Sequence, residues 1–257
     1  MFTLEELLCY KSLSPLRITV GVIRAHLCDI RLAMEQKEEV ALTNIFPFLD
    51  FQFHRQSVSF TPQKYTTLSL DLVSFVAYHG MTDIVAGLLP HYDTGSVRDI
   101  LTIPLCLSLL NNKSETARFL LSKGADPRGE ACTNGLHAAA KAGLQNMVSD
   151  FIVQWKIPAD CVDAYGATPT IYALYLPENH AIKIITVLLY HGASPKRTFG
   201  SNCTTYACLA NAMGKKTLAH WLQQTETDSF NYAIDCLQKQ TQNIRLEEEN
   251  DADWDFL

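Results

Sequence analysis

The sequence lacks any long uninterrupted run of apolar residues. Its longest apolar stretch, "LTIPLCLSLL" at 101–110, contains a proline and is about half the length of the ~18 residues that a membrane-spanning helix needs. The first ten residues, "MFTLEELLCY", hold two acidic residues and no basic residue, so they do not resemble a secretory signal. These absences predict a soluble protein inside the cell, cytoplasmic or nuclear, with no membrane partner.

The known signatures of phosphate, dinucleotide, esterase, zinc-protease and calcium sites are also missing. The eight cysteines form no C-x-x-C pair, and most lie in apolar segments, which favours buried free thiols over a zinc site or a disulfide framework. The sequence therefore predicts no metal, no cofactor and no catalytic residue. It leaves open an enzyme or a small-molecule-binding accessory protein that uses a tyrosine-lined groove.

Basic residues are too few for a nucleic-acid footprint. The net charge is −6, and six acidic residues account for all of it: Glu247, Glu248, Glu249, Asp251, Asp253 and Asp255. The remaining chain is formally neutral, so the composition predicts no nucleic-acid partner.

Two nine-residue segments, "FLLSKGADP" at 119–127 and "VLLYHGASP" at 187–195, are nearly the same and lie 68 residues apart. Each has the pattern of an amphipathic helix that ends at a glycine, the residue that best accommodates a left-handed backbone. Gly80 and Gly143 follow two further helical segments, and each precedes another helix. The pattern predicts repeated helix–turn–helix units.

The first helices of these units begin with "IPLC" at 103–106, "NGLH" at 134–137 and "ATPT" at 167–170. Together with the glycines, these segments resemble the ankyrin repeat, whose units follow roughly G-x-T-P-L-H-x-A-x-x-x-G and then V-x-x-L-L-x-x-G-A-D. The units begin near residues 71, 103, 134, 168 and 205, with spacings of 32, 31, 34 and 37 residues, close to the family's ~33. The resemblance implies an all-α ankyrin-repeat solenoid of about five helix–turn–helix units with short hairpin loops.

Individual positions in the units carry further expectations. Pro104 and Pro169 are expected in the first turn of a helix, where the missing N–H is not needed. Asn112 replaces the inter-helix glycine of the second unit, and "YLPENHAI" lengthens the turn of the fourth. The resemblance assigns His137 a structural role, in which it forms hydrogen bonds across the hairpin loops.

The chain divides into three parts. Residues 1–65 are expected to form an N-terminal helical cap with room for a degenerate repeat, in which "EEVALTNIFPFL" at 38–49 is a candidate second helix. The segment "FQFHRQSVSF" at 51–60 alternates like a short hairpin around Arg55 and Gln56. The repeats occupy residues 66–224, and residues 225–257 form a C-terminal helix that fades into the acidic tail.

In the ankyrin family, the concave face is built from the hairpin tips and the residues just before the inter-helix glycine. Aligned positions imply a partner-binding surface that contains Tyr78, His79, Asn111, Glu130, Thr133, Lys141, Tyr165 and Tyr175. Tyrosines anchor many protein interfaces, so at least one of the three is expected to contact a partner. Packing of a given tyrosine against a neighbouring unit is the alternative.

The acidic tail ends in Trp254, Phe256 and Leu257. Acids followed by Trp-x-x-Leu resemble the short motif that binds autophagy ubiquitin-like modifiers, while the terminal carboxylate would also suit a PDZ groove, and the tryptophan could instead pack on the solenoid. The predicted function is a protein–protein interaction or adaptor protein, with one partner on the concave face and a possible second partner at the tail.

Overall fold

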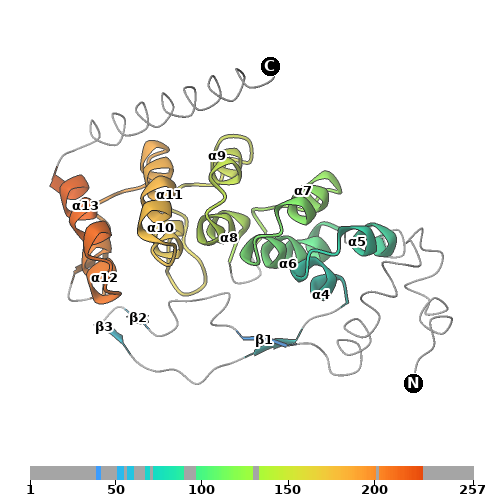
Figure 1. Cartoon of the computed structure of the whole chain (residues 1–257), viewed down its shortest axis with the longest axis horizontal. Helices are drawn as coiled ribbons and strands as arrows, with labels where there is room; N and C mark the ends of the chain where they lie inside the picture. The colour runs from blue at the N-terminus through green and yellow to red at the C-terminus, as the bar shows by residue number, and fades with distance from the viewer. Residues whose placement is uncertain are drawn as a thin grey trace, which may run out of the picture.

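The computed structural model describes residues 39–41, 51–54, 57–60, 67–69, 72–89, 97–129, 133–200 and 203–227. Its body is a row of antiparallel helix pairs (Figure 1). In chain order, the pairs are α4 (Leu72–Tyr78) with α5 (Thr82–Leu88), α6 (Val97–Leu110) with α7 (Ser114–Ser122), α8 (Gly135–Ala142) with α9 (Gln145–Val153), α10 (Pro169–Ala173) with α11 (Glu178–Tyr190), and α12 (Tyr206–Ala212) with α13 (Lys216–Thr227).

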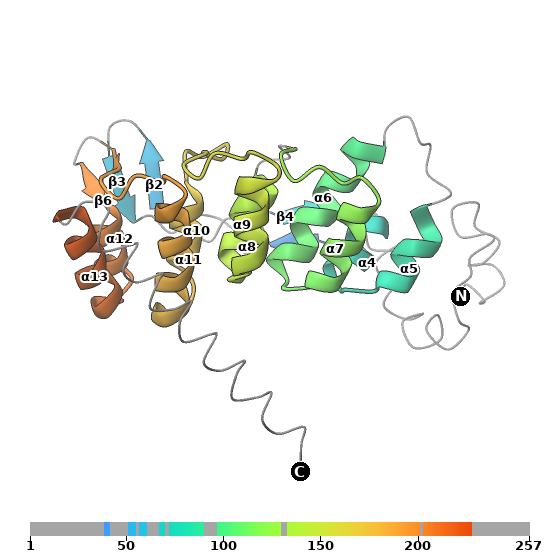
Figure 2. The same ribbon diagram turned by 90° about the horizontal axis from the view of Figure 1, so that it is seen from above.

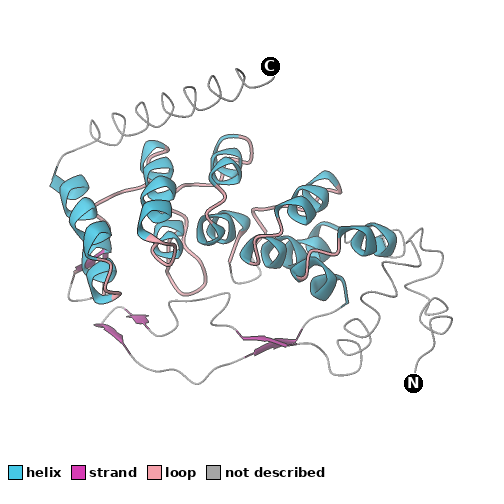
Figure 3. Ribbon diagram, viewed as in Figure 1, coloured by secondary structure: helices cyan, strands magenta, loops and turns pink. Residues whose placement is uncertain are grey.

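The pairs stack into two layers, as the five predicted units require. The first helices α4, α6, α8 and α10 contact one another in sequence, and among the second helices α5 contacts α7, while α11 contacts both α9 and α13 (Figure 3). Seen from above, the turns within the pairs lie at one end of the helices and the longer connections between pairs lie at the other (Figure 2). The array therefore has a turn end and a hairpin end.

Left-handed residues end the first helices where the sequence predicted them. Gly80 and Gly143 have φ angles of 77° and 74°, and Gly214 of the fifth pair has 77°. Asn112 takes the same conformation at φ 55°, which asparagine tolerates better than most side chains. At the N-terminal end of α8, the carboxamide oxygen of Asn134 accepts hydrogen bonds from the backbone amides of Leu136 and His137, as an N-cap residue should.

One predicted helix start is wrong. Pro169 opens α10 as expected, whereas Pro104 lies inside α6, because that helix begins at Val97 rather than near residue 103. An interior proline costs about 3 kcal/mol because it removes a backbone hydrogen bond and clashes with the preceding turn. The residues added before Pro104 include Leu101 and Thr102, which are buried, and the burial of Leu101 offsets part of that cost.

Small side chains let the units approach each other. Ala138, Ala139 and Ala140 of α8 are fully buried at the centre of the array. Around them, leucines from both layers fill the joints between units, including Leu120 and Leu188 of the two repeated nine-residue segments. The core is continuous along the array, so no pair buries its apolar face alone.

The described part of the N-terminal region consists of short strands. β2 (Phe51–His54) pairs with β3 (Ser57–Phe60), which confirms the predicted hairpin. β1 (Glu39–Ala41) pairs with β4 (Thr67–Ser69), so the candidate helix at 38–49 is wrong at these three residues, where backbone pairing to a distant strand replaces helical bonds. The rest of the expected cap, and the tail after Thr227, lie outside the described residues.

A third small hairpin joins β5 (Thr198–Phe199) to β6 (Thr204–Thr205) in front of α12. Phe199 of this hairpin is buried and meets the ring of Tyr206 at 5.2 Å between centroids. None of the described helices is both long and apolar enough to cross a membrane.

Candidate partner-binding surface

The predicted surface residues fall into two rows at opposite ends of the first helices. Tyr78, His79, Asn111, Lys141 and Tyr175 lie at the turn end and are called the turn row here. Thr133 and Tyr165 lie at the hairpin end, and together with Val162, which was not predicted, they are called the tip row here. Helix α8 has eight residues and separates the two ends by about 12 Å, so the rows are two edges of one face rather than a single patch.

Aromatic rings gather at the first unit of the turn row. The ring of His79 lies 4.4 Å from that of Phe75 and 5.3 Å from that of Tyr78. Phe75 is buried, Tyr78 is partly buried and His79 is exposed, so the cluster extends from the core to the surface. Tyr78 therefore packs within its own unit and also presents an edge to solvent.

The second unit reaches back to the first. The side-chain amide of Asn111 donates a hydrogen bond of 2.7 Å to the carbonyl of Tyr78. The aliphatic chain of Lys113 lies over Gly80, so closely that a Cβ at Gly80 would come within 2.7 Å of it. Asn111 is thus a structural tie between units, and its predicted role as a partner contact is not needed to explain it.

Lys141 lies at the centre of the turn row, in the last turn of α8. Burial lowers the pKa of its amino group to about 8. Among the residues whose side chains the structure describes, no carboxylate lies at ion-pair distance from it. A half-buried cation without a counter-ion is costly, so Lys141 is the member of the row with the greatest gain from an acidic partner.

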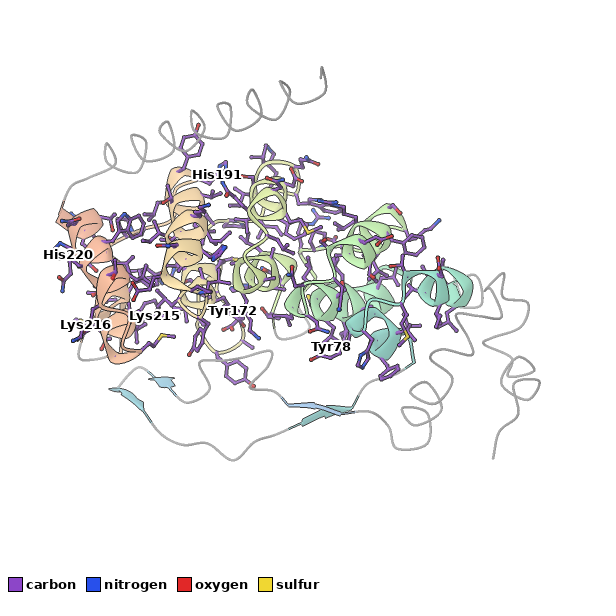
Figure 4. All side chains as sticks on the ribbon, viewed as in Figure 1. Tyr78, Tyr172, His191, Lys215, Lys216 and His220 are labelled. Carbon is purple, nitrogen blue, oxygen red and sulfur yellow. The ribbon has the colours of Figure 1, made fainter. Side chains whose placement is uncertain are left out.

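The lengthened turn of the fourth unit is used for packing. Leu176 would touch a Cβ at Gly143 at 3.4 Å, so it covers the turn of the third unit. Lys215, from the fifth unit, reaches back in turn and donates hydrogen bonds to the carbonyls of Leu174 and Leu176 (Figure 4). The neighbouring Lys216 points away from this joint.

A buried aspartate shapes the tip row. Asp163 accepts hydrogen bonds from the amides of Tyr165 and Ala167 at 2.8 and 2.9 Å through one oxygen, and from the hydroxyl of Tyr172 at 2.7 Å through the other. Burial raises the pKa of Asp163, and these donors lower it in part. The loop is therefore fixed, and it presents Val162 and Tyr165 with 44% and 45% of their surfaces exposed.

The remaining predicted contacts differ in status. Thr133 is 4% exposed, and this burial argues against contact through its side chain. Tyr175 is partly buried against the core. Glu130, Trp254 and Leu257 lie outside the described residues.

The structural role predicted for His137 is confirmed. Its ring is fully buried at the joint between the third and fourth units. One nitrogen lies 2.8 Å from the carboxamide oxygen of Asn134, and the other lies 3.1 Å from the carbonyl of Ala167 in the next hairpin loop. Burial lowers its pKa to about 4, against an opposite effect of the carbonyls of Ala167 and Cys161.

The cysteines that the structure describes form no disulfide, as predicted, but they are not all buried. Cys106 is buried and its pKa is raised to about 12 by burial. Cys161 is partly exposed, whereas Cys203 and Cys208 are exposed, so burial was wrong for these two. Helical spacing placed Cys208 on α12 but could not tell which face of that short helix meets the core.

The described residues hold no group of three or more histidine, cysteine or acidic side chains that could bind a metal ion. The functional residues that sequence reasoning missed are Asp163, Val162 and Lys215. An Asp two residues before Tyr165 and three before Gly166 is a turn signal, which could have identified the first. Nothing local indicates that Lys215 bonds to residues 39 and 41 positions earlier.

Stacked helix pairs with turns at one end and hairpin loops at the other define a helical-repeat solenoid. Comparison with known protein families matches residues 105–199 to a family described as "Ankyrin repeats (3 copies)". Residues 105–199 are therefore ankyrin repeats, which confirms the resemblance for the second, third and fourth units. A search of curated proteins finds no match to the chain.

Proposed function

We propose that the chain is a non-enzymatic adaptor that holds a protein partner between the tip row and the turn row. Ankyrin repeats are in general protein-interaction modules, and this supports the class of function. The observation that carries the proposal is the loop fixed by Asp163. This loop holds Val162 and Tyr165 nearly half exposed, so neither side chain is placed in the core.

The physical reason is preorganisation. A partner that covers Tyr165 gains the burial of a large aromatic side chain, and it spends little entropy because the backbone is already fixed by the carboxylate of Asp163. At the other edge, an acidic group on the partner would neutralise the half-buried amino group of Lys141. The partner that fits is therefore one with an apolar groove for the tyrosine and an acidic residue about one helix length away.

The tail supplies a second docking site in this proposal. Six acidic residues precede or flank Trp254 and Leu257, and this composition supports a peptide that binds by two apolar anchors and a charged rim. Two docking sites on one chain would bring two proteins together, which is what an adaptor does.

The test compares partners that co-purify with matched variants of the full chain. Tyr165→Ala removes the tip-row anchor, and Tyr190→Ala removes an equally exposed tyrosine on the second-helix layer, 53% exposed, as the control. The expected result is that one partner is lost with Tyr165→Ala and kept with Tyr190→Ala. A third variant, Trp254→Ala with Leu257→Ala, should lose a different partner.

Equal effects of the two tyrosine variants would show that the tip row is not the binding surface. An unchanged partner list for the tail variant would refute the tail as a docking site and leave the first result intact. If no protein co-purifies with any form of the chain, the adaptor function itself is wrong.

A further inference from the structure

A thiol, an imidazole and a carboxamide meet at the base of the tip-row loop. The Sγ atom of Cys161 lies 4.0 Å from Nε2 of His137. Nδ1 of the same ring lies 2.8 Å from Oδ1 of Asn134, and Nδ2 of Asn134 donates a hydrogen bond of 3.3 Å to the sulfur. Asn134 and His137 begin α8 of one unit, whereas Cys161 belongs to the loop before α10, so two units assemble the group.

The orientation of the carboxamide decides where protons can be. Oδ1 of Asn134 accepts hydrogen bonds from the backbone amides of Leu136 and His137 at 3.0 and 3.2 Å, so this atom is the oxygen and not the nitrogen. An amide oxygen only accepts, so the 2.8 Å contact is favourable only if Nδ1 of His137 carries a proton. The same holds for Nε2 and the carbonyl oxygen of Ala167 at 3.1 Å, but a neutral ring carries a proton on only one of its nitrogens.

Either neutral tautomer leaves one ring nitrogen facing an acceptor. With the proton on Nδ1, the lone pair of Nε2 faces the carbonyl oxygen of Ala167, and with the proton on Nε2, the lone pair of Nδ1 faces Oδ1 of Asn134. The nearest described group that can supply a proton to Nε2 is the thiol of Cys161. Once the proton has moved, Nε2 donates to Ala167 and the sulfur anion accepts from Nδ2 of Asn134.

Burial does not forbid this transfer. It disfavours uptake of a proton from solvent by His137, because that would place a lone cation in the core. Transfer from Cys161 creates a cation and an anion side by side and leaves the net charge of the site unchanged. Adjacent imidazolium groups and hydrogen bonds to sulfur are the features that stabilise reactive thiolates in proteins.

We propose that Cys161 is a reactive cysteine that exchanges with small disulfides. The thiolate attacks one sulfur of the disulfide, the S–S bond of the reagent breaks, and its other half leaves as a thiolate. The product is a mixed disulfide on Cys161, with no net oxidation, and the proton that came from Cys161 remains on His137 or passes to the leaving thiolate. Cys161 is partly exposed, so the reagent can reach it.

The same chain provides the comparison cysteines. Cys106 is buried, and burial keeps it protonated. Cys208 is more exposed than Cys161, and the described residues give its sulfur no imidazole partner. If access alone governed the reaction, Cys208 would react faster than Cys161.

The test measures, for the full chain, the rate at which dithiodipyridine modifies each cysteine, with mass spectrometry to locate the adduct, between about pH 5 and pH 9. An ordinary thiol with a pKa of about 8.5 is only ~1% ionised at pH 6.5. The expected result is that Cys161 reacts at least ~10-fold faster than Cys208 at pH 6.5, with the difference shrinking above about pH 8.5.

The matched variant is Asn134→Thr. Threonine occupies the N-cap position of α10 and α12, at Thr168 and Thr205, and the side chain of Thr205 caps its helix, so threonine suits the backbone. The threonine hydroxyl can donate a hydrogen bond to Nδ1, so a neutral ring with its single proton on Nε2 satisfies both contacts. The substitution also removes the side-chain amide that donates to the sulfur. The rate of modification of Cys161 should fall at least ~5-fold at pH 6.5 in this variant, while the rate at Cys208 stays the same.

Two results would overturn the proposal. One is a Cys161 rate in the unmodified chain that is equal to or below that of Cys208 across the pH range. The other is a high modification rate at Cys161 that Asn134→Thr leaves unchanged, because the carboxamide and imidazole would then not be the cause of the reactivity. The first comparison needs no variant, so it holds even if Asn134→Thr folds poorly.

Discussion

The substitution Tyr172→Phe tests how the tip-row loop is held. It deletes one hydroxyl from a side chain that is fully buried, and that hydroxyl donates a 2.7 Å hydrogen bond to Asp163. A hydrogen bond to a charged group contributes about 1.5–3 kcal/mol, and one to a neutral group contributes about 0.5–1.5 kcal/mol. The free energy of unfolding should therefore fall by about 2 kcal/mol at pH 7, where Asp163 is ionised.

The pH dependence gives the sign of the effect. Burial raises the folded-state pKa of Asp163, so its ionisation costs stability as the pH rises above the unfolded pKa of about 3.9. The hydroxyl of Tyr172 lowers that pKa, and its removal makes ionisation costlier still. The loss in the variant should accordingly be about 2 kcal/mol at pH 7 and about 1 kcal/mol near pH 4, where the carboxyl is protonated.

Urea unfolding at several pH values, followed by circular dichroism, measures this difference, and the loss at pH 7 corresponds to a fall in Tm of about 4–8 °C. Tyr206→Phe is the matched control, because its buried hydroxyl bonds to the neutral hydroxyl of Thr168 at 2.8 Å. It should cost about 1 kcal/mol at every pH. Equal pH profiles for the two variants, or a larger loss for Tyr172→Phe at pH 4, would refute the reasoning.

Five further substitutions, in three sets, test the turn end of the array. Lys141→Met should raise the free energy of unfolding by about 1 kcal/mol at pH 7, after allowance for solvent screening, because burial lowers the pKa of this amino group to about 8 and the cation costs stability below that pH. Chemical unfolding should show the gain decline between about pH 8 and the unfolded pKa of about 10.4 and vanish above it, and a gain that grows with pH would contradict it. Lys215→Ala should cost about 2 kcal/mol and speed hydrogen exchange in α12 and α13, whereas Lys216→Ala should do neither. Gly143→Ala should cost about 1–2 kcal/mol in thermal unfolding because its φ is 74°, and Asn112→Gly should change stability by less than about 0.5 kcal/mol, so equal losses at the two positions would be inconsistent with a left-handed turn at both.

Local rules predicted the units well. The glycine positions, the helix pairs and the role of His137 follow from periodicity, turn chemistry and the family pattern, all of which act within one or two units. Pro104 shows where such rules fail. Its position in "IPLC" at 103–106 suits a helix start, but contacts with neighbouring units extended the helix toward the N-terminus, and only tertiary packing decides that outcome.

The candidate surface was predicted less well for a related reason. The alignment identified Tyr165 but not Asp163. The role of the aspartate in fixing the loop depends on its hydrogen bond to Tyr172, nine residues later, and on the curvature of the loop between them. The alignment also combined both ends of the first helices into one surface, since a sequence pattern identifies exposed positions but not the distance across a helix. Thr133 has a tip position and is nevertheless buried.

Two side chains of the described residues, Asn111 and Lys215, donate hydrogen bonds to the turn of the preceding unit, and both point the same way along the chain. Asn111 donates a hydrogen bond to the carbonyl of Tyr78 in the first unit. Lys215 donates hydrogen bonds to the carbonyls of Leu174 and Leu176 in the fourth unit. The array is therefore polar: removing the first unit leaves the donor of Asn111 at the surface, where water can replace its partner, whereas removing the last unit strips two helix-end carbonyls of a charged donor. Shortening the array from its C-terminal end should destabilise what remains more than shortening it from the N-terminal end, and any loss of structure should spread inward from the fifth pair once that pair has opened.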